Sequence, residues 1–301
     1  MRGDRPSRTA ITIALALLSL RRRRGGGSLV SSDDAETLRA GLANLGEGTR
    51  RLASVACSRF ARPLVRFLEW ATVPDVILHF GLRKRLIEQT VRRAIAGGST
   101  QVVVLAAGLD LLALKLSREG SAVRLIEIDH PATQRAKRIL LEGVMPPARD
   151  VTLIAADLAT ETPADALRRS KAFDERRSTV FVVEGLTMYL TESQVRSLLT
   201  GLGSTSGAAR LVFTFMEPDS RGRTRFVRQT ALLRAFLRLS GEPFQWGIPA
   251  ASLPNFLAQC GWRVRAILGA TDFASEAQGR GLSFKASQFV GEFVAEAERV
   301  R

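Results

Sequence analysis

Three carboxylates follow three separate apolar runs of this sequence, at positions where they could bind a polar ligand. Asp129 ends RLIEID, Asp157 follows VTLIAA, and Glu184 follows TVFVV. The run QVVVL is followed instead by a loop with a single glycine, Gly108. Short apolar runs of this kind are typical of buried strands in a parallel sheet, whose carboxyl ends bind ligands. The pattern therefore predicts one pocket that contains Gly108 and the three acids.

Gly108 and Asp129 have the spacing of a nucleoside site. A glycine has no Cβ, so a ligand can approach its backbone closely, and a carboxylate about twenty residues later can accept hydrogen bonds from two ribose hydroxyls. A dinucleotide site would carry further glycines beneath the pyrophosphate, but Leu111 and Leu112 stand there. The loop thus favours a nucleoside without phosphates. The alternatives are an ordinary strand–helix turn at Gly108 and a helix cap at Asp129 before Pro131.

The other two acids indicate which further chemical groups the ligand carries. Asp157 could accept a hydrogen bond from the exocyclic amine of adenine, although a helix N-cap is an alternative. Glu184 ends a buried apolar strand, where an unpaired carboxylate is costly, so we expect a cationic ligand amine as its partner. Ribose, adenine and an amino group together describe S-adenosylmethionine, a sulfonium nucleoside without phosphates. One close-approach glycine suffices for such a ligand.

The elements that would position these residues alternate between strand and helix. The expected strands are 101–105, 122–128, 151–155, 179–183, 210–215, 262–268 and 288–295. The expected helices among them are 111–118, 132–143, 163–170, 192–202 and 251–260. This alternation predicts a Rossmann-like α/β fold with a mostly parallel, seven-stranded sheet and helices on both faces.

Helical patterns dominate the residues before the first strand. Residues 75–96 predict an amphipathic helix ended by two glycines, and the helical pattern of 49–68 is expected to break at Pro63. Residues 10–20, AITIALALLSL, resemble the apolar part of a signal peptide, but four arginines follow where a cleavage site would stand. The segment is also shorter than the about 20 residues that span a bilayer. We therefore expect a buried helix capped by Ser7, and no membrane span.

A helical N-terminal region and an α/β core are expected to pack as one structural domain. The N-terminal region, 1–97, would form a lid over the core, 98–301. Residues 217–250 interrupt the alternation and predict a basic, helical insertion. Three arginines of this insertion could attract an acidic acceptor, or they could simply lie on the exposed side of a helix. They are Arg223, Arg225 and Arg228.

The amino-acid composition bears on which classes of partner the protein could bind. The formal net charge of +15 raises the question of a nucleic-acid partner. However, only five of the 44 basic residues are lysines, a bias that also follows from a GC-rich genome, and no nucleic-acid-binding motif accompanies them. We expect a solvated basic surface instead. The two cysteines and two histidines lack metal-ligand spacing, which predicts no metal site and a reducing, cytoplasmic location.

At these residues the chain resembles the leucine carboxyl methyltransferase family, in its bacterial branch of S-adenosylmethionine-dependent O-methyltransferases. The resemblance covers nearly the whole chain. It is carried by RPSRTA, HFGLRKRLIEQTVRRAI, VVVLAAGLDLLALKL, RLIEIDHPATQRAKR, AADL, VVEGLTMYLTESQV and GEPFQWGIP. The sequence departs from the family where Ala106 replaces the usual glycine and Leu111 the usual threonine.

The resemblance implies a role for each matching residue. Asp129 would bind the ribose beside Gly108, and Glu184 would bind the amino group. Arg83 would hold the methionine carboxylate, although a solvated helix face is the alternative. The remaining contacts implied are Asp157 and Leu158 to the adenine, and Arg8 to the cofactor.

The predicted function is O-methylation of a small-molecule carboxylate or hydroxyl, for example in secondary metabolism; a protein C-terminal carboxylate is a less expected acceptor. Substitution at a sulfonium requires alignment and exclusion of water, and only a hydroxyl acceptor would require a base. Tyr189 and His79 are the candidate catalytic residues, and either could instead be packed in the core.

Two other functions compete with O-methylation. An NAD-type oxidoreductase is disfavoured by Leu111 and Leu112, whereas the charge and Ala106 favour a basic nucleic-acid-binding or regulatory protein with a relict nucleoside pocket.

Overall fold

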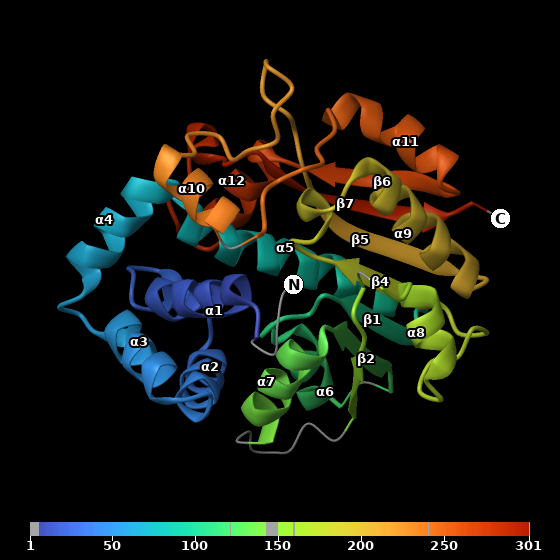
Figure 1. The fold of residues 1–301 in the computed structure, drawn as a ribbon, viewed down its shortest axis with the longest axis horizontal. Helices are drawn as coiled ribbons and strands as arrows, with labels where there is room; N and C mark the ends of the chain where they lie inside the picture. The colour runs from blue at the N-terminus through green and yellow to red at the C-terminus, as the bar shows by residue number, and fades with distance from the viewer. Residues whose placement is uncertain (1–5, 121, 143–149, 159, 240, 301) are drawn as a thin grey trace.

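The computed structural model describes residues 6–120, 122–142, 150–158, 160–239 and 241–300. Within these residues, seven strands form one sheet in the order β3-β2-β1-β4-β5-β7-β6 (Figure 1). β1 to β5 pair in parallel, and β7 runs antiparallel between β5 and β6. The strands are β1 (Gln101–Leu105), β2 (Arg124–Asp129), β3 (Val151–Ala155), β4 (Thr179–Val183), β5 (Ala209–Met216), β6 (Trp262–Leu268) and β7 (Glu292–Arg299). The expected α/β fold with a mostly parallel, seven-stranded sheet is confirmed.

The central strands β1 and β4 are apolar at nearly every position because the sheet is covered on both faces there. In β1, Val102 and Val104 belong to one buried cluster, whereas Val103 and Leu105 belong to the other. Successive side chains of a strand point to opposite faces, so each run contributes to both cores. This explains why these central strands lack alternation between polar and apolar residues.

Helices on the two faces come from different parts of the chain. The first cluster includes residues of α1, α2, α5, α6, α7 and α12, and the second those of α8, α9 and α11. The helices of the first half are α1 (Arg8–Arg21), α2 (Ser32–Asn44), α3 (Glu47–Cys57), α4 (Arg62–Thr72), α5 (Val76–Ala96) and α6 (Leu112–Arg118). Those that follow are α7 (Pro131–Glu142), α8 (Pro163–Arg169), α9 (Glu192–Thr205), α10 (Ala231–Leu239), α11 (Leu253–Gln259) and α12 (Ala270–Gly279).

The N-terminal segment is a helix, as expected. The Ser7 side chain caps α1 by accepting a hydrogen bond from the Ala10 backbone N–H at 3.2 Å. Leu17, Leu18 and Leu20 are buried against the core. None of the helices in the described part of the chain has the length and apolar character needed to cross a bilayer.

Several boundaries differ from the sequence-based expectation. The helical break lies at 58–61, and Pro63 instead occupies the first turn of α4, where its missing N–H costs nothing. Strand β7 begins four residues later than expected, after a 3-10 turn at Ala286–Gln288. The insertion is mostly loop, because α10 is the one α-helix among its described residues. Helix α12 was not anticipated, although Phe273 and Ala277 lie one turn apart on its buried side. Gly143, the expected end of α7, lies outside the described residues.

Candidate functional site

A cavity of about 1560 Å³ opens at the carboxyl ends of the parallel strands. Strands β1 and β4 are neighbours there, with Leu105 paired to Val183, yet the chain leaves them in opposite directions across the sheet. Such a switch in strand order is where open α/β sheets bind ligands. The walls come from the loops after β1, β2, β3 and β4, from helix α1, and from residues 238, 239, 241–243 and 245 of the insertion.

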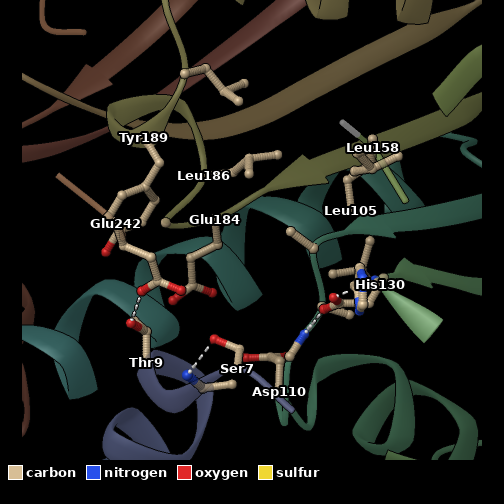
Figure 2. Close-up of a pocket in the computed structure, with 18 of the residues that line it drawn as sticks. Ser7, Thr9, Leu105, Asp110, His130, Leu158, Glu184, Leu186, Tyr189 and Glu242 are labelled. Carbon is tan, nitrogen blue, oxygen red and sulfur yellow. Dashed lines mark hydrogen bonds between the residues drawn. The ribbon is translucent and has the colours of Figure 1, made fainter. Parts of the chain in front are cut away.

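The tertiary fold brings most of the sequence-predicted site residues to this cavity. Figure 2 shows Glu184 and Tyr189 at one end, with Leu158 toward the other. The cavity is lined by Arg8, Arg83, Gly108, Asp129, Asp157, Leu158, Glu184 and Tyr189. His79 is not among the described residues that line it. The insertion contributes a different arginine from those expected, because Arg238 lines the cavity whereas Arg223 and Arg225 pair with Asp219.

Gly108 and Asp129 are joined directly. One carboxylate oxygen of Asp129 accepts from the Gly108 backbone N–H at 2.6 Å, and the other accepts from the His130 N–H at 2.6 Å. Burial raises the pKa of Asp129, and the two N–H donors oppose that effect. A carboxylate has about four lone-pair sites, so two remain for ligand hydroxyls. A Cβ on Gly108 would lie 3.1 Å from the Ala10 side chain, which shows how closely α1 approaches this loop.

The loop before Gly108 is strained at Ala106, whose φ of +50° lies in the left-handed region. A residue with a Cβ pays about 1–2 kcal/mol there, and glycine pays none. Ala106→Gly should therefore stabilise the protein by up to about 1 kcal/mol, after the extra chain entropy of glycine is subtracted. Ala107→Gly is the matched control, since Ala107 is buried and has no positive φ. Urea denaturation would measure both, and equal losses of stability in the two variants would contradict the strain.

Arg83 is the centre of a buried ion-pair network. Its guanidinium contacts the Glu184 carboxylate at 2.7 Å and the Glu292 carboxylate at 2.6 Å. Burial alone would lower the pKa of Arg83, but the two carboxylates raise it above its ordinary value. Glu184 therefore already has protein cations as partners, Arg83 and Lys84, where a ligand amine was the expected one.

Glu292 and His79 extend this network away from the cavity. Nε2 of His79 lies 3.2 Å from Glu292, and its ring stacks on Phe273 with 4.6 Å between ring centroids. Burial lowers the pKa of His79 despite the nearby Glu292, so the ring is neutral at pH 7. Its Nδ1 has no partner among the described residues, which assigns the proton to Nε2. His79 thus donates to Glu292 and orients the carboxylate that holds Arg83.

The network makes stability depend on pH in acid. Burial opposes the ionisation of Glu292, but Arg83 and His79 outweigh it and lower the pKa to about 2 from 4.5. A depressed carboxyl pKa stabilises the fold above the unfolded value, and this contribution is lost as pH falls from 4.5 towards 2. The free energy of unfolding, measured by urea denaturation, should therefore decrease through this window.

The variant Glu292→Gln tests this assignment. It should be less stable than the wild type at pH 7, and its free energy of unfolding should change less between pH 4.5 and 2. Glu36→Gln, at an exposed position on α2, serves as the control. Equal acid slopes for the wild type and Glu292→Gln would contradict the pairing.

A second cluster of charged side chains surrounds Asp110, in the loop that follows β1. Lys84 contacts Asp110, and buried Lys137 contacts both the Asp110 backbone oxygen and the Glu127 carboxylate. Burial opposes the ionisation of Asp110, but Lys84 and Lys137 lower its pKa to about 2. Lys84 and Asp110 line the cavity together with Glu184. This end of the cavity therefore presents both cationic and anionic groups.

Tyr189 and the insertion form the opposite wall of the same end (Figure 2). Burial and the neighbouring Glu242 raise the pKa of the Tyr189 phenol well above its usual range, so it remains protonated at neutral pH. Thr9 of α1 donates a hydrogen bond to Glu242, and Gln245 donates to the Tyr189 backbone oxygen at 2.7 Å. These bonds join α1, the insertion and the β4 loop around the cavity.

Sequence reasoning missed Lys84, Asp110, Glu242 and Glu292. A usable signal existed for Lys84, because lysine is rare in a chain with 44 basic residues. Lys84, Lys115 and Lys137 all pair with carboxylates in the structure. No comparable pattern marked Glu292, since its position depends on how β7 enters the sheet.

Known proteins resemble this chain over much of its length. The family model of the leucine carboxyl methyltransferases matches residues 43–203. A relative from Mycobacteroides abscessus, assigned as an S-adenosyl-L-methionine-dependent methyltransferase, is 32% identical over 211 residues, which are 64% of each chain. The match therefore spans a little less than two thirds of that relative. A Mycobacterium marinum relative with the same assignment is 30% identical over 217 residues, 68% of this chain and 71% of its own.

A solved structure shares the fold. The DUF574 family protein from Streptomyces avermitilis has a TM-score of 0.57 and 13% identity, and the match covers 92% of this chain and all of that one. The family model and the Mycobacterium marinum relative together show that the chain belongs to the leucine carboxyl methyltransferase family.

Proposed function

We propose that this chain binds S-adenosylmethionine and transfers its methyl group to an oxygen atom of a small molecule. The observation that carries the proposal is that three kinds of group line the same cavity. Leu158 lies toward one end, and Glu184 and Tyr189 lie at the other (Figure 2). Asp129, which also lines the cavity, accepts a hydrogen bond from the Gly108 N–H. These groups suit the adenine, the methionine end and the ribose of the cofactor, respectively.

The donor set fits the charges of the cofactor. Asp129 retains acceptor sites for the ribose diol, and Asp157 is an acceptor for the adenine amine. The methionine end is a zwitterion, and the wall near it holds both Glu184 and the cations Arg83 and Lys84. Lys84 is the more accessible cation, since its side chain is 21% exposed against 3% for Arg83. We therefore assign Lys84 a share in holding the carboxylate.

The cofactor supplies a methyl group on a leaving group that its positive charge has already activated. The protein has to align the acceptor and exclude water. The cavity exceeds the range of about 300–1,000 Å³ typical of a single ligand, so an acceptor fits beside the cofactor. Protonated Tyr189 is suited to donate a hydrogen bond to the acceptor. Glu242 is the carboxylate on the insertion that could accept the proton of a hydroxyl acceptor.

Transfer from methyl-labelled S-adenosylmethionine to panels of carboxylic acids, phenols and amines tests the proposal. We expect labelled products from an oxygen acceptor. Mild base then separates the two kinds of oxygen product, because methyl esters release labelled methanol and methyl ethers do not. Products from amines alone would overturn O-methylation. Failure of the folded protein to bind S-adenosylmethionine would overturn methyl transfer itself.

A further inference from the structure

Helix α4 shows the reverse of the usual burial, because its acid is buried and several of its apolar side chains are exposed. Surface helices of soluble proteins turn their apolar stripe towards the core. Here the one buried residue of α4 is Glu69, while Phe67 and Trp70 are 59% and 66% exposed. Leu64 on the same helix is also exposed. Figure 1 shows α4 at the left edge of the molecule, where it projects from the core.

Specific bonds of Glu69 maintain this orientation. Its carboxylate pairs with Arg23 at 2.5 Å and accepts the Ile77 backbone N–H, in the first turn of α5, at 2.9 Å. Helix N-termini leave such N–H groups unsatisfied unless an acceptor caps them. Turning α4 to bury Phe67 and Trp70 would break both bonds and leave a buried donor of α5 without a partner. The exposed apolar side chains are therefore a stable feature of the fold.

Helix α10 starts beside the end of α4 and also exposes apolar side chains. Thr230, just before α10, donates its backbone N–H to the Thr72 oxygen at 3.0 Å and its hydroxyl to the Ala71 oxygen at 2.6 Å. These bonds tie the start of α10 to the end of α4. On α10 the exposed apolar residues recur at i, i+4 and i+7: Leu232, Phe236 and Leu239. We call Leu64, Phe67, Trp70, Leu232, Phe236 and Leu239 the α4–α10 face.

The charges around this face are positive. Exposed arginines accompany it on both helices and on the link before α4: Arg59, Arg62, Arg66, Arg234 and Arg238. None of them takes part in an ion pair found among the described residues. Glu69 is the one acid in the two helical sequences, and Arg23 already pairs with it. A second copy of the chain would bring a like-charged surface and a net charge of +15 against this face.

We propose that the α4–α10 face docks on an anionic lipid surface. Amphipathic helices with apolar side chains flanked by arginines lie in the plane of a membrane interface, with the apolar groups in the acyl boundary and the cations among the headgroups. Arg238 and Leu239 also line the cavity, so docking brings the cavity mouth to the lipid. An amphiphilic methyl acceptor would enter from there. That consequence rests on the proposed function, whereas docking itself does not.

Tryptophan fluorescence reports docking without any cofactor. Trp70 is exposed, whereas Trp246 and Trp262 are buried. Vesicles of phosphatidylcholine with about 30% phosphatidylglycerol should shift the emission to the blue, and vesicles of phosphatidylcholine alone should do so much less. The shift should be absent in Trp70→Phe and weaker at about 0.5 M NaCl.

Co-sedimentation with the same vesicles tests which residues contribute to lipid binding. Phe67→Ser/Phe236→Ser and Arg62→Gln/Arg66→Gln/Arg234→Gln should each bind at least tenfold more weakly than the wild type. Val300→Ser and Arg176→Gln are the controls, at exposed positions outside the α4–α10 face, and should bind as the wild type does.

The outcomes separate docking from its alternatives. Binding lost in the face variants but kept in the controls supports the proposal. It is overturned if the wild type ignores anionic vesicles or if the face variants bind as the wild type does. It is equally overturned if the Trp70 emission shifts without lipid as a dimer appears in analytical ultracentrifugation, because the face is then an interface between copies. Because no methyl donor is present, failure here leaves the proposed methyl transfer unaffected.

Discussion

Replacing Arg83 by methionine is expected to lower the free energy of unfolding by about 3–5 kcal/mol, the usual cost of removing one partner of a buried ion pair. Glu292 is fully buried and would lose the guanidinium that compensates its charge. Glu184 would lose one of its two cations. Urea denaturation at pH 7 measures the loss. Arg85→Met, two residues along α5 and partly exposed, is the matched control and should cost under about 1 kcal/mol.

A double variant separates the ion pair from simple loss of packing. In Arg83→Met/Glu292→Met both charges are removed, and an apolar pair of similar size can replace a buried ion pair at little cost. We therefore expect the double variant to recover most of the stability lost in Arg83→Met. A loss equal to the sum of the two single variants would contradict the pairing. Calorimetry with S-adenosylhomocysteine on the same proteins would show whether the methionine end of the cofactor also depends on Arg83.

Asp129→Ala is expected to weaken binding of S-adenosylhomocysteine by about 100-fold or more. Two hydrogen bonds from ribose hydroxyls to a carboxylate are worth about 1.5–3 kcal/mol each. The variant also removes the acceptor of the Gly108 N–H, which holds the loop in place. Asp129→Asn keeps one carbonyl oxygen and should lose less. Titration calorimetry measures all three proteins.

Two controls show whether a loss of affinity in Asp129→Ala is specific to the ligand contact. Asp33→Ala removes an exposed carboxylate in the first turn of α2 and should bind the ligand as the wild type does. Thermal unfolding of each variant shows that the fold is retained. Unchanged affinity in a folded Asp129→Ala protein would remove Asp129 from the site, and would leave the ribose to another acceptor on the cavity wall.

Strands β1 and β4 were readable from local sequence because every residue of both is buried. A strand buried on both faces must be apolar at nearly every position, so the run and the strand coincide. The edge strands β3 and β6 also begin and end where predicted, although they are only partly buried. The predicted boundaries were wrong at the start of β7, which follows a 3-10 turn, and in the insertion, which is mostly loop. The residues of the cavity wall could be predicted for a different reason: parallel strands bring their carboxyl ends to one edge of the sheet.

The sequence by itself thus determined the class of fold, the cavity edge, and the positions of Gly108, Asp129 and Glu184 on it. Only the tertiary structure decided what those groups contact. Glu292 reaches Arg83 because β7 runs antiparallel, which brings its first residue opposite Met216 at the carboxyl end of β5. The reversed burial of α4 depends on Glu69 capping a different helix, α5. Both are contacts between residues distant along the chain or in separate elements, and local patterns of polarity carry no information about such pairings.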